Sequence, residues 1–475
     1  MIKNRIILFC VIILFMATSA MGEGPVSKST AEDQTAVEIT VYNSNLGLVK
    51  ETRRIDIPSG QGELRFMDVA SRINPVTVHV KSVNSPKLFT VVEQNYEYDL
   101  MNEKKLLDKY VGKKIKIIDW NEYQDRKYTV KAELLSNNEG QIYRIGGEIY
   151  LGHPGVKVFP ELPENLIAKP TLTWLYKNGS KVPHNLEVSY LTDGISWKAD
   201  YVLVLDKDDT STDISGWVTV DNKSGATYGD ATLQLVAGKV HRAERQSPDR
   251  AALMKGMVME DAAEPQFKEK AFYEYHIYDL QRKTTIKDRQ TKQISLFEAA
   301  GVGIKKEFLV QGTRAYFTNR VGGDKTKTPV NVYVKFKNSK DNSLGMPLPE
   351  GIMRIYKKDE RGSQQFVGED RIEHTPRNEE VKLKTGEAFD IVAERRQKDF
   401  KKLSTKLYES EWEITLKNRK KNDIVVGVIE PLFGNWQLIE NSHQYTKVDA
   451  FTIRFDVTVP KDKEVTVTYR VRVGT

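Results

Sequence analysis

Apolar and polar residues alternate along most of this chain, which is the period expected of β-strands with one buried face. Three runs share one form, in which apolar residues at every second position lead to an asparagine: GWVTVDN (residues 216–222), VYVKFKN (332–338) and WEITLKN (412–418). Asparagine tolerates left-handed backbone angles and its side chain bonds nearby backbone groups, so it closes strands well. The runs therefore predict sandwich strands whose apolar residues, including Val334 and Ile414, point into a core.

This pattern predicts an all-β protein made of several Ig-like β-sandwich units. An N-terminal β-domain is expected over residues 37–100, and one or more sandwich domains over residues 171–475. The three runs lie about 80 to 120 residues apart, which matches one sandwich domain and is too irregular for a repeat array. Residues 241–270 lose the alternation and mix both charges, so an exposed loop is expected there.

The middle of the chain carries a different pattern. NEKKLLDKYVG, residues 102–112, has Leu106, Leu107 and Tyr110 at helical spacing, and four short strand patterns follow it. A helix followed by four strands predicts a small SH3-like or Sm-like barrel over residues 101–152. Such barrels bind peptides or RNA, or act as inert spacers; we expect a spacer, because a fold alone does not imply a function.

Four prolines then fall within residues 153–170. Proline cannot donate a hydrogen bond to a sheet, so this segment is expected to be a connector and a domain boundary near residue 170.

The first 20 residues have the form of a secretory signal peptide. Lys3 and Arg5 precede an apolar run that ends at Met16, and the small residues ATSA follow. The run is short for a bilayer span, although a retained anchor is the alternative. Residues 21–36 are polar and are expected to form a flexible lead. An exported protein, periplasmic or secreted, is predicted, with no transmembrane segment after cleavage.

Composition narrows the possible partners and sites. The 475 residues carry a net charge of +7, which is mild for so long a chain, and nucleic acid is not an expected partner. The only cysteine, Cys10, lies within the predicted signal peptide, so the mature chain would hold no thiol or disulfide. Sites for thiolate-binding metals are therefore not expected.

Motifs for catalysis are also missing from the sequence. HExxH, GxSxG and GxxxxGK[ST] do not occur, and the seven histidines do not form local pairs. We therefore expect no catalytic, metal-binding or cofactor-binding residues, and a non-catalytic envelope protein. An envelope hydrolase, with a site assembled between domains from distant strands, is the alternative.

One aromatic and basic segment is a candidate partner-binding site. In FYEYHIYD, Tyr273 and Tyr275 fall on one face of the expected strand, and Arg282, Lys283 and Lys287 follow. Exposed tyrosines stack on sugar rings or peptides, whereas strand tyrosines more often lie buried or cover a sheet edge. The expected partner is an envelope protein or a surface glycan.

Several longer stretches resemble a bacterial exported domain-of-unknown-function family, whose domain also forms the C-terminal part of mucoidy-inhibitor-like proteins. They are EVSYLTDGISWKADYVLVL, GWVTVDNKSGATYGDATLQLVAGKV, LPEGIMRIYKKDERGSQQFVGEDRIEHTP and YTKVDAFTIRFDVTVP, which occur in that order within residues 170–475. ITVYNSNLGLVK, residues 39–50, resembles the N-terminal β-domain of the same proteins. Those proteins hold a long coiled coil between the two parts, which this chain lacks, and the family offers no catalytic residues to carry over.

Overall fold

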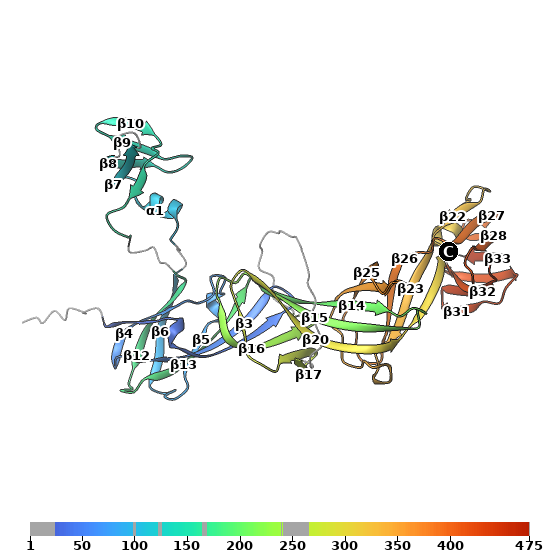
Figure 1. Ribbon diagram of the computed structural model, residues 1–475, viewed down its shortest axis with the longest axis horizontal. Helices are drawn as coiled ribbons and strands as arrows, with labels where there is room; N and C mark the ends of the chain where they lie inside the picture. The colour runs from blue at the N-terminus through green and yellow to red at the C-terminus, as the bar shows by residue number, and fades with distance from the viewer. Residues whose placement is uncertain are drawn as a thin grey trace, which may run out of the picture. The chain divides into compact units, whose positions relative to one another are not determined.

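The computed structural model describes residues 24–97, 101–121, 126–163, 169–238, 240 and 266–474. Almost every element in these residues is a β-strand (Figure 1), which confirms the predicted all-β class with several sandwich sheets. The chain divides into two compact units, Met1–Val37 with Lys50–Tyr190 and Glu38–Val49 with Leu191–Thr475. The predicted signal peptide lies outside the described residues.

Two sheets contain the N-terminal strands. The four-stranded sheet has the order β1 (Val26–Ser29), β4 (Gly60–Met67), β12 (Thr171–Asn178) and β6 (Phe89–Glu97). The eight-stranded sheet has the order β17 (Phe267–Phe272), β18 (Tyr275–Leu280), β16 (Tyr228–Ala237), β2 (Gln34–Tyr42), β3 (Leu46–Ile55), β13 (His184–Asp193) and β5 (His79–Ser82), with β19 (Thr284–Ile286) beside β16. Two 3-10 turns accompany them, η1 (Ala31–Asp33) and η2 (Pro75–Thr77).

The flexible lead expected over residues 21–36 is wrong for its described part, because residues 26–36 form regular structure. β1 pairs in parallel with β4, and Val26 lies opposite Glu63. The Asp33 carboxylate accepts the Thr30 amide at 3.0 Å, which caps η1 at its start. Alternation alone does not predict this short polar strand, because its parallel partner comes from a distant part of the sequence.

The boundary between the compact units does not fall near residue 170 of the sequence. β12 lies between β4 and β6, and β13 pairs with β5, where Val188 lies opposite Val80. Both strands follow the proline-rich segment in sequence, yet they complete sheets that begin before residue 100. Prolines show where a chain leaves a sheet, but not which sheet the next strands join.

A small separate sheet is formed by residues 101–163. Its order is β10 (Glu148–Leu151), β9 (Ile142–Ile145), β8 (Arg126–Ser136), β7 (Lys114–Asn121) and β11 (Val156–Val158). The predicted helix is confirmed as α1 (Glu103–Lys109). It begins after Asn102, whose side-chain oxygen accepts the Lys105 amide at 2.9 Å, and it buries Leu107 in the core of this sheet.

This small sheet is not a closed barrel. Among the described strands, β10 pairs with β9 alone and β11 pairs with β7 alone, so the sheet keeps two free edges. β11 comes from the segment expected to be a connector, with Val156 opposite Ile118. The strand is three residues long and lies between Gly155 and Pro160. Glycine and proline usually mark loops, so the sequence pattern does not predict a strand there.

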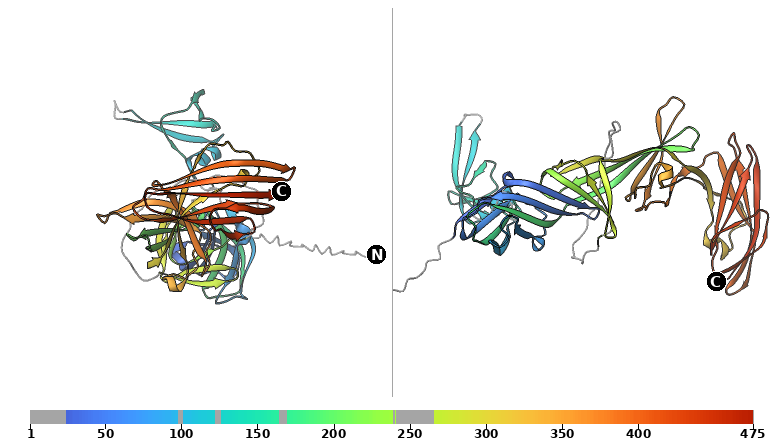
Figure 2. Two further views of the ribbon diagram at one scale, coloured as in Figure 1. Left: turned by 90° about the vertical axis from the view of Figure 1, so that its right-hand side faces the viewer. Right: turned by 90° about the horizontal axis from the view of Figure 1, so that it is seen from below.

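Three sheets contain the C-terminal strands. The first has the order β20 (Gln290–Gly303), β15 (Ser211–Asn222), β14 (Ile195–Leu205), β24 (Gly351–Lys358) and β25 (Gln364–Ile372). The second has the order β26 (Glu380–Glu387), β23 (Val330–Lys337), β21 (Lys305–Gln311), β29 (Ile424–Pro431), β32 (Thr452–Val459) and β31 (Thr446–Asp449). The third has the order β22 (Thr326–Thr328), β27 (Ile391–Ser404), β28 (Leu407–Asn418), β33 (Glu464–Gly474) and β30 (Asn435–Asn441), and its red strands run side by side in Figure 2. Two 3-10 turns lie between strands of this part, η3 (Arg314–Phe317) and η4 (Lys340–Asn342).

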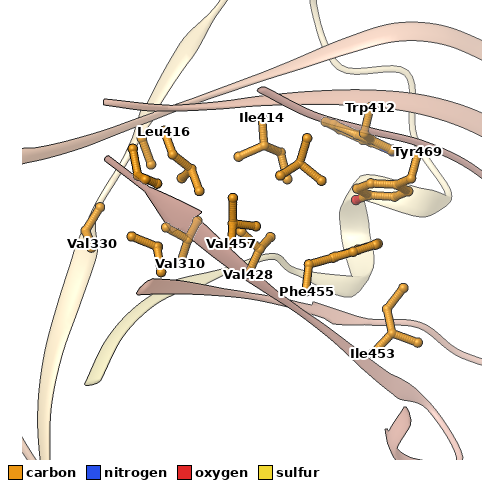
Figure 3. Close-up of a cluster of buried hydrophobic side chains, with 14 of the residues drawn as sticks. Val310, Val330, Trp412, Ile414, Leu416, Val428, Ile453, Phe455, Val457 and Tyr469 are labelled. Atoms are coloured by element: carbon orange, nitrogen blue, oxygen red, sulfur yellow. The ribbon is translucent and has the colours of Figure 1, made fainter. Parts of the chain in front are cut away.

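The last two sheets face each other across an apolar core. Trp412, Ile414 and Leu416 of β28 point toward Val428 of β29 and Val457 of β32 (Figure 3). Ile414 is 0% exposed and Val334 of β23 is 1% exposed, which confirms the predicted inward faces. Alternation along each strand therefore places the aliphatic and aromatic residues inside.

Asn418 shows how a predicted asparagine closes its strand. Its side-chain amide donates to the carbonyl oxygens of Asn422, Val459 and Pro460 at 2.9, 3.0 and 3.2 Å. Its side-chain oxygen accepts the Lys420 amide at 2.9 Å. The Asn418 side chain is fully buried, and four backbone groups satisfy its polar atoms.

The other two predicted asparagines act in the same way. The Asn222 amide donates to the carbonyls of Ala226 and Lys287, and its oxygen accepts the Ser224 amide. The Asn338 amide donates to the carbonyls of Met346 and Pro376, and its oxygen accepts the Gly345 amide. All three are 0% exposed, so they are internal anchors between neighbouring chain segments rather than surface turn residues.

A fourth anchor, Asn178, ends β12. It donates to the carbonyls of Ile57 and Pro58 at 2.8 and 3.3 Å, and it accepts the Ser180 amide at 2.7 Å. The stretch TLTWLYKN, residues 171–178, carries the same alternation ending in asparagine, so the sequence did contain a signal for it.

Candidate binding site

The candidate tyrosines lie at the tip of the hairpin formed by β17 and β18. The sequence predicts an exposed loop over residues 241–270. Its last residues, from 267 onward, belong to strand β17 instead. Residues 241–265 lie outside the described part. Phe272 pairs with Tyr275 across the hairpin, and Tyr273 and Glu274 form the turn. Tyr273 therefore occupies the turn instead of a strand face shared with Tyr275.

Tyr273 has a backbone conformation that is unusual for its size. Its φ of +54° lies in the left-handed region, which glycine and asparagine adopt far more readily. Its side chain is 86% exposed, and the neighbouring Phe272 is 60% exposed. Two large aromatic side chains thus project from a turn that a smaller residue would form at lower cost.

The ring of Tyr275 lies close to both Gly238 and the exposed ring of Tyr273. A Cβ at Gly238 would lie 2.5 Å from the Tyr275 ring, so the ring packs directly on that glycine. Burial raises the pKa of the Tyr42 hydroxyl, and the nearby Tyr275 raises it further. The rings of Tyr273 and Tyr275 lie 6.1 Å apart at an angle of 46°. The half-buried ring of Tyr275 therefore forms a base for the exposed ring of Tyr273.

The three basic candidates lie at the other end of the hairpin. Arg282 follows β18 and donates to the side chain of Gln266, which immediately precedes β17. The strands between this point and the tip span roughly 20 Å at about 3.4 Å per residue. The five candidate residues therefore do not form one site.

The basic end has its own electrostatic character. Lys283 is paired with Asp230 at 2.9 Å. Burial lowers the pKa of the Lys292 ammonium, and the positive charges of Arg282 and Lys287 lower it further. Arg282 and Lys287 therefore each lie close enough to Lys292 to repel its charge.

One constellation resembles a catalytic triad in its residue types. Ser82 Oγ lies 2.8 Å from His184 Nδ1, and His184 Nε2 lies 2.9 Å from the side-chain oxygen of Asn178. Ser82 and His184 are 1% and 0% exposed, so no substrate could reach the hydroxyl. Burial lowers the pKa of the His184 imidazole, which favours the neutral ring that donates to the Asn178 anchor. The arrangement stabilises the fold.

A second polar cluster lies in the core of the last two sheets. Arg395 of β27 donates to the Glu430 carboxylate of β29 at 2.6 Å and to the Tyr469 hydroxyl of β33 at 3.4 Å. Burial alone would lower the pKa of the Arg395 guanidinium, but Glu430 and Tyr469 outweigh it and hold that pKa above its usual value. The charged pair links the two sheets, and its side chains are only 3% and 0% exposed.

A surface hollow of about 460 Å³ carries one histidine and one carboxylate, His276 and Asp341, beside Lys340 and Arg377. His276 Nδ1 lies 2.7 Å from Glu269, and these side chains are 40% and 24% exposed. Water therefore screens this pair, whereas acid–base catalysis usually relies on groups shielded by burial.

The remaining described residues offer few signs of catalytic chemistry. Within the described ranges, no group of three His, Cys, Asp or Glu side chains is placed to hold a metal ion. The described helical segments are all too short or too polar to cross a bilayer. Compared with models of known protein families and with curated proteins, the chain gives no match.

Proposed function

We propose that this chain is a non-catalytic, exported cell-envelope protein that binds a partner protein or a surface glycan through the tip of the β17–β18 hairpin. The observation that carries the proposal is Tyr273, an exposed aromatic residue in a left-handed turn position. Export rests on the signal-peptide pattern of residues 1–20. The resemblance to the envelope family of unknown function is part of the same proposal.

Strain and exposure together support a binding role for the tip. A left-handed conformation costs a residue with a side chain roughly 1–2 kcal/mol of folding free energy. Burial does not offset this cost at Tyr273, because its ring lies in solvent. Folding alone would favour glycine or asparagine at this turn. An exposed Tyr–Phe pair over a supporting ring is suited to stack on a sugar face or to enter a pocket of a protein.

The test compares two double variants of the exported protein. Phe272→Ser with Tyr273→Ser removes the tip, and Phe366→Ser with Val367→Ser removes another exposed apolar pair, from β25. We expect the tip variant to lose about tenfold or more in binding to isolated envelopes, while the control variant binds as the wild type. Equal binding by both variants would contradict the proposal.

The same assay separates the two partner classes. Envelopes treated with protease would lose binding if the partner is a protein, and envelopes treated with periodate would lose binding if it is a glycan. For the alternative, an envelope hydrolase, the Ser82–His184 pair offers no support because both side chains are buried.

A further inference from the structure

The small sheet of residues 101–163 has one face that its own helix does not cover. Ile117 of β7 and Leu134 of β8 lie on the inner face, where they pack with Leu107 of α1. Side chains alternate along each strand, so the even-numbered residues of β7 and their partners on β8 and β11 point to the opposite face. Most of the described side chains on that face, here called the outer face, are exposed.

An apolar cluster occupies one end of the outer face. Ile118 of β7 lies opposite Val156 of β11, and Trp120 and Val158 are the next residues on this face of the same two strands. Trp120 is 56% exposed and Val156 is 68% exposed, while Ile118 is half-buried. A tryptophan among exposed aliphatic side chains is the composition of a binding hot spot rather than of an ordinary solvated sheet.

Lysines occupy the middle of the same face. Lys116 lies directly opposite Lys131, and Lys127 lies opposite Trp120. All three are exposed, and so is Lys114, and none of the four is ion-paired with a described residue. Among the described residues of this face the one carboxylate, Glu133, is paired with Arg144 at 2.9 Å. Like charges directly opposite each other destabilise a sheet, so folding alone does not favour this arrangement.

We propose that the outer face is a docking surface for an acidic, extended segment of a partner protein. Apolar side chains of the segment would cover Trp120 and Val156, and its carboxylates would neutralise the lysines. Five strands about 4.8 Å apart give a face roughly 24 Å wide, which a peptide of about seven or eight extended residues would cross. The charge of the face selects the partner, and the tryptophan provides the buried contact.

A lipid surface is the other anionic partner, and the arrangement of charges disfavours it. Lys116 and Lys131 lie between the Trp120 cluster and a second apolar pair, Ile149 and Leu151 of β10. Immersing both apolar groups in a bilayer would draw these ammonium groups in with them, which is costly.

The test uses the full exported chain and a synthetic peptide of about eight residues whose every second position, in the order Val, Val, Glu, Glu, faces the sheet, with serine between them. A peptide with lysine in place of glutamate is its control. We expect the acidic peptide alone to bind, and binding to weaken as salt rises. Lys116→Glu with Lys131→Glu, and separately Trp120→Ala, should each weaken it about tenfold or more. The matched controls are Lys177→Glu and Leu175→Ala, exposed residues of β12, which should leave binding unchanged.

Each other outcome would overturn the docking surface. These outcomes are no binding of the acidic peptide, equal binding by the variants and the wild type, and equal binding of the two peptides. Vesicles of phosphatidylglycerol and phosphatidylcholine provide the last comparison. Binding to them that is lost in Trp120→Ala, with no peptide binding, would assign the face to a lipid surface. Circular dichroism of each variant verifies that the sheets are intact.

Discussion

Arg395 and Glu430 form an ion pair in the interior of the C-terminal sandwich, 2.6 Å apart and 3% and 0% exposed. They come from facing sheets, since Arg395 lies on β27 and Glu430 on β29. Tyr316 and Trp412 flank the guanidinium, with ring centres 4.9 and 5.5 Å from it. A charge held this deeply depends on its partner.

Removing both members of this pair should cost less than the sum of the losses from removing each one alone. Arg395→Met alone should lower the free energy of unfolding by about 3–5 kcal/mol, because it leaves the Glu430 carboxylate buried without a partner. Arg395→Met with Glu430→Leu should cost less than the sum of the single variants. Urea denaturation of all three measures this, and additive losses would contradict the account. Arg419→Met, in an exposed pair with Glu464, is the control and should change stability by no more than about 1 kcal/mol.

The strand-end asparagines should be sensitive to truncation. Asn418→Ala removes the donor to three carbonyls and the acceptor of the Lys420 amide, so we expect a loss of about 4 kcal/mol at roughly 1 kcal/mol per bond. Asn435→Ala, at an exposed strand position, should have little effect. Thermal unfolding of the two variants measures the difference, and similar melting temperatures would show that the Asn418 bonds contribute nothing net.

His184 should make the N-terminal unit less stable in mild acid. Burial holds its pKa below the ordinary value of 6.5, so the unfolded chain takes up a proton that the folded chain refuses. The contribution of His184 is therefore present above about pH 6.5 and is lost as pH falls below it, at up to about 1.4 kcal/mol per pH unit.

The measurement is the free energy of unfolding between pH 8 and pH 5 for wild type, His184→Gln and His79→Gln. His184→Gln should be less stable at pH 8 but should lose less stability in acid. His79 is exposed, so its variant should follow the wild type. An unchanged acid slope in His184→Gln would show that this imidazole does not titrate differently on folding.

Relief of the left-handed strain at the hairpin tip should be measurable. Tyr273→Gly should raise the free energy of unfolding by about 1 kcal/mol, because glycine adopts a φ of +54° without a Cβ clash. The same variant should lose binding to envelopes. A Tyr273→Gly variant that is markedly less stable would mean that the ring supports the fold, and the case for a binding tip would fail.

The alternation of apolar residues predicted most of the strands, because the residues that face inward can be identified from each strand's own sequence. Val334 and Ile414 were predicted inside and lie inside. Arg395 and Gln397 have the same parity as the buried Ile391, and both are buried. The buried charge itself was not predicted, because arginine is usually exposed and its partner Glu430 lies on β29, which is distant in sequence.

The sequence pattern could not predict which distant segments pair with each other. β1 is too short and polar to read by itself and depends on its parallel partner β4, while β12 and β13 join sheets across the proline-rich segment. At the candidate site, the types of Tyr273 and Tyr275 were informative, but the turn at Tyr273 was not foreseen because the sequence offers no glycine or asparagine there. Phe272 was overlooked as part of the tip for the same reason.

Site-specific photocrosslinking in the living cell tests the proposed function most directly. A photoreactive phenylalanine analogue would replace Tyr273 in one variant and Phe366, which is exposed on β25, in a control variant. We predict a discrete crosslinked species of higher mass at position 273 that is absent at position 366. No crosslink at position 273, or the same species at both positions, would contradict the claim that the hairpin tip binds a partner.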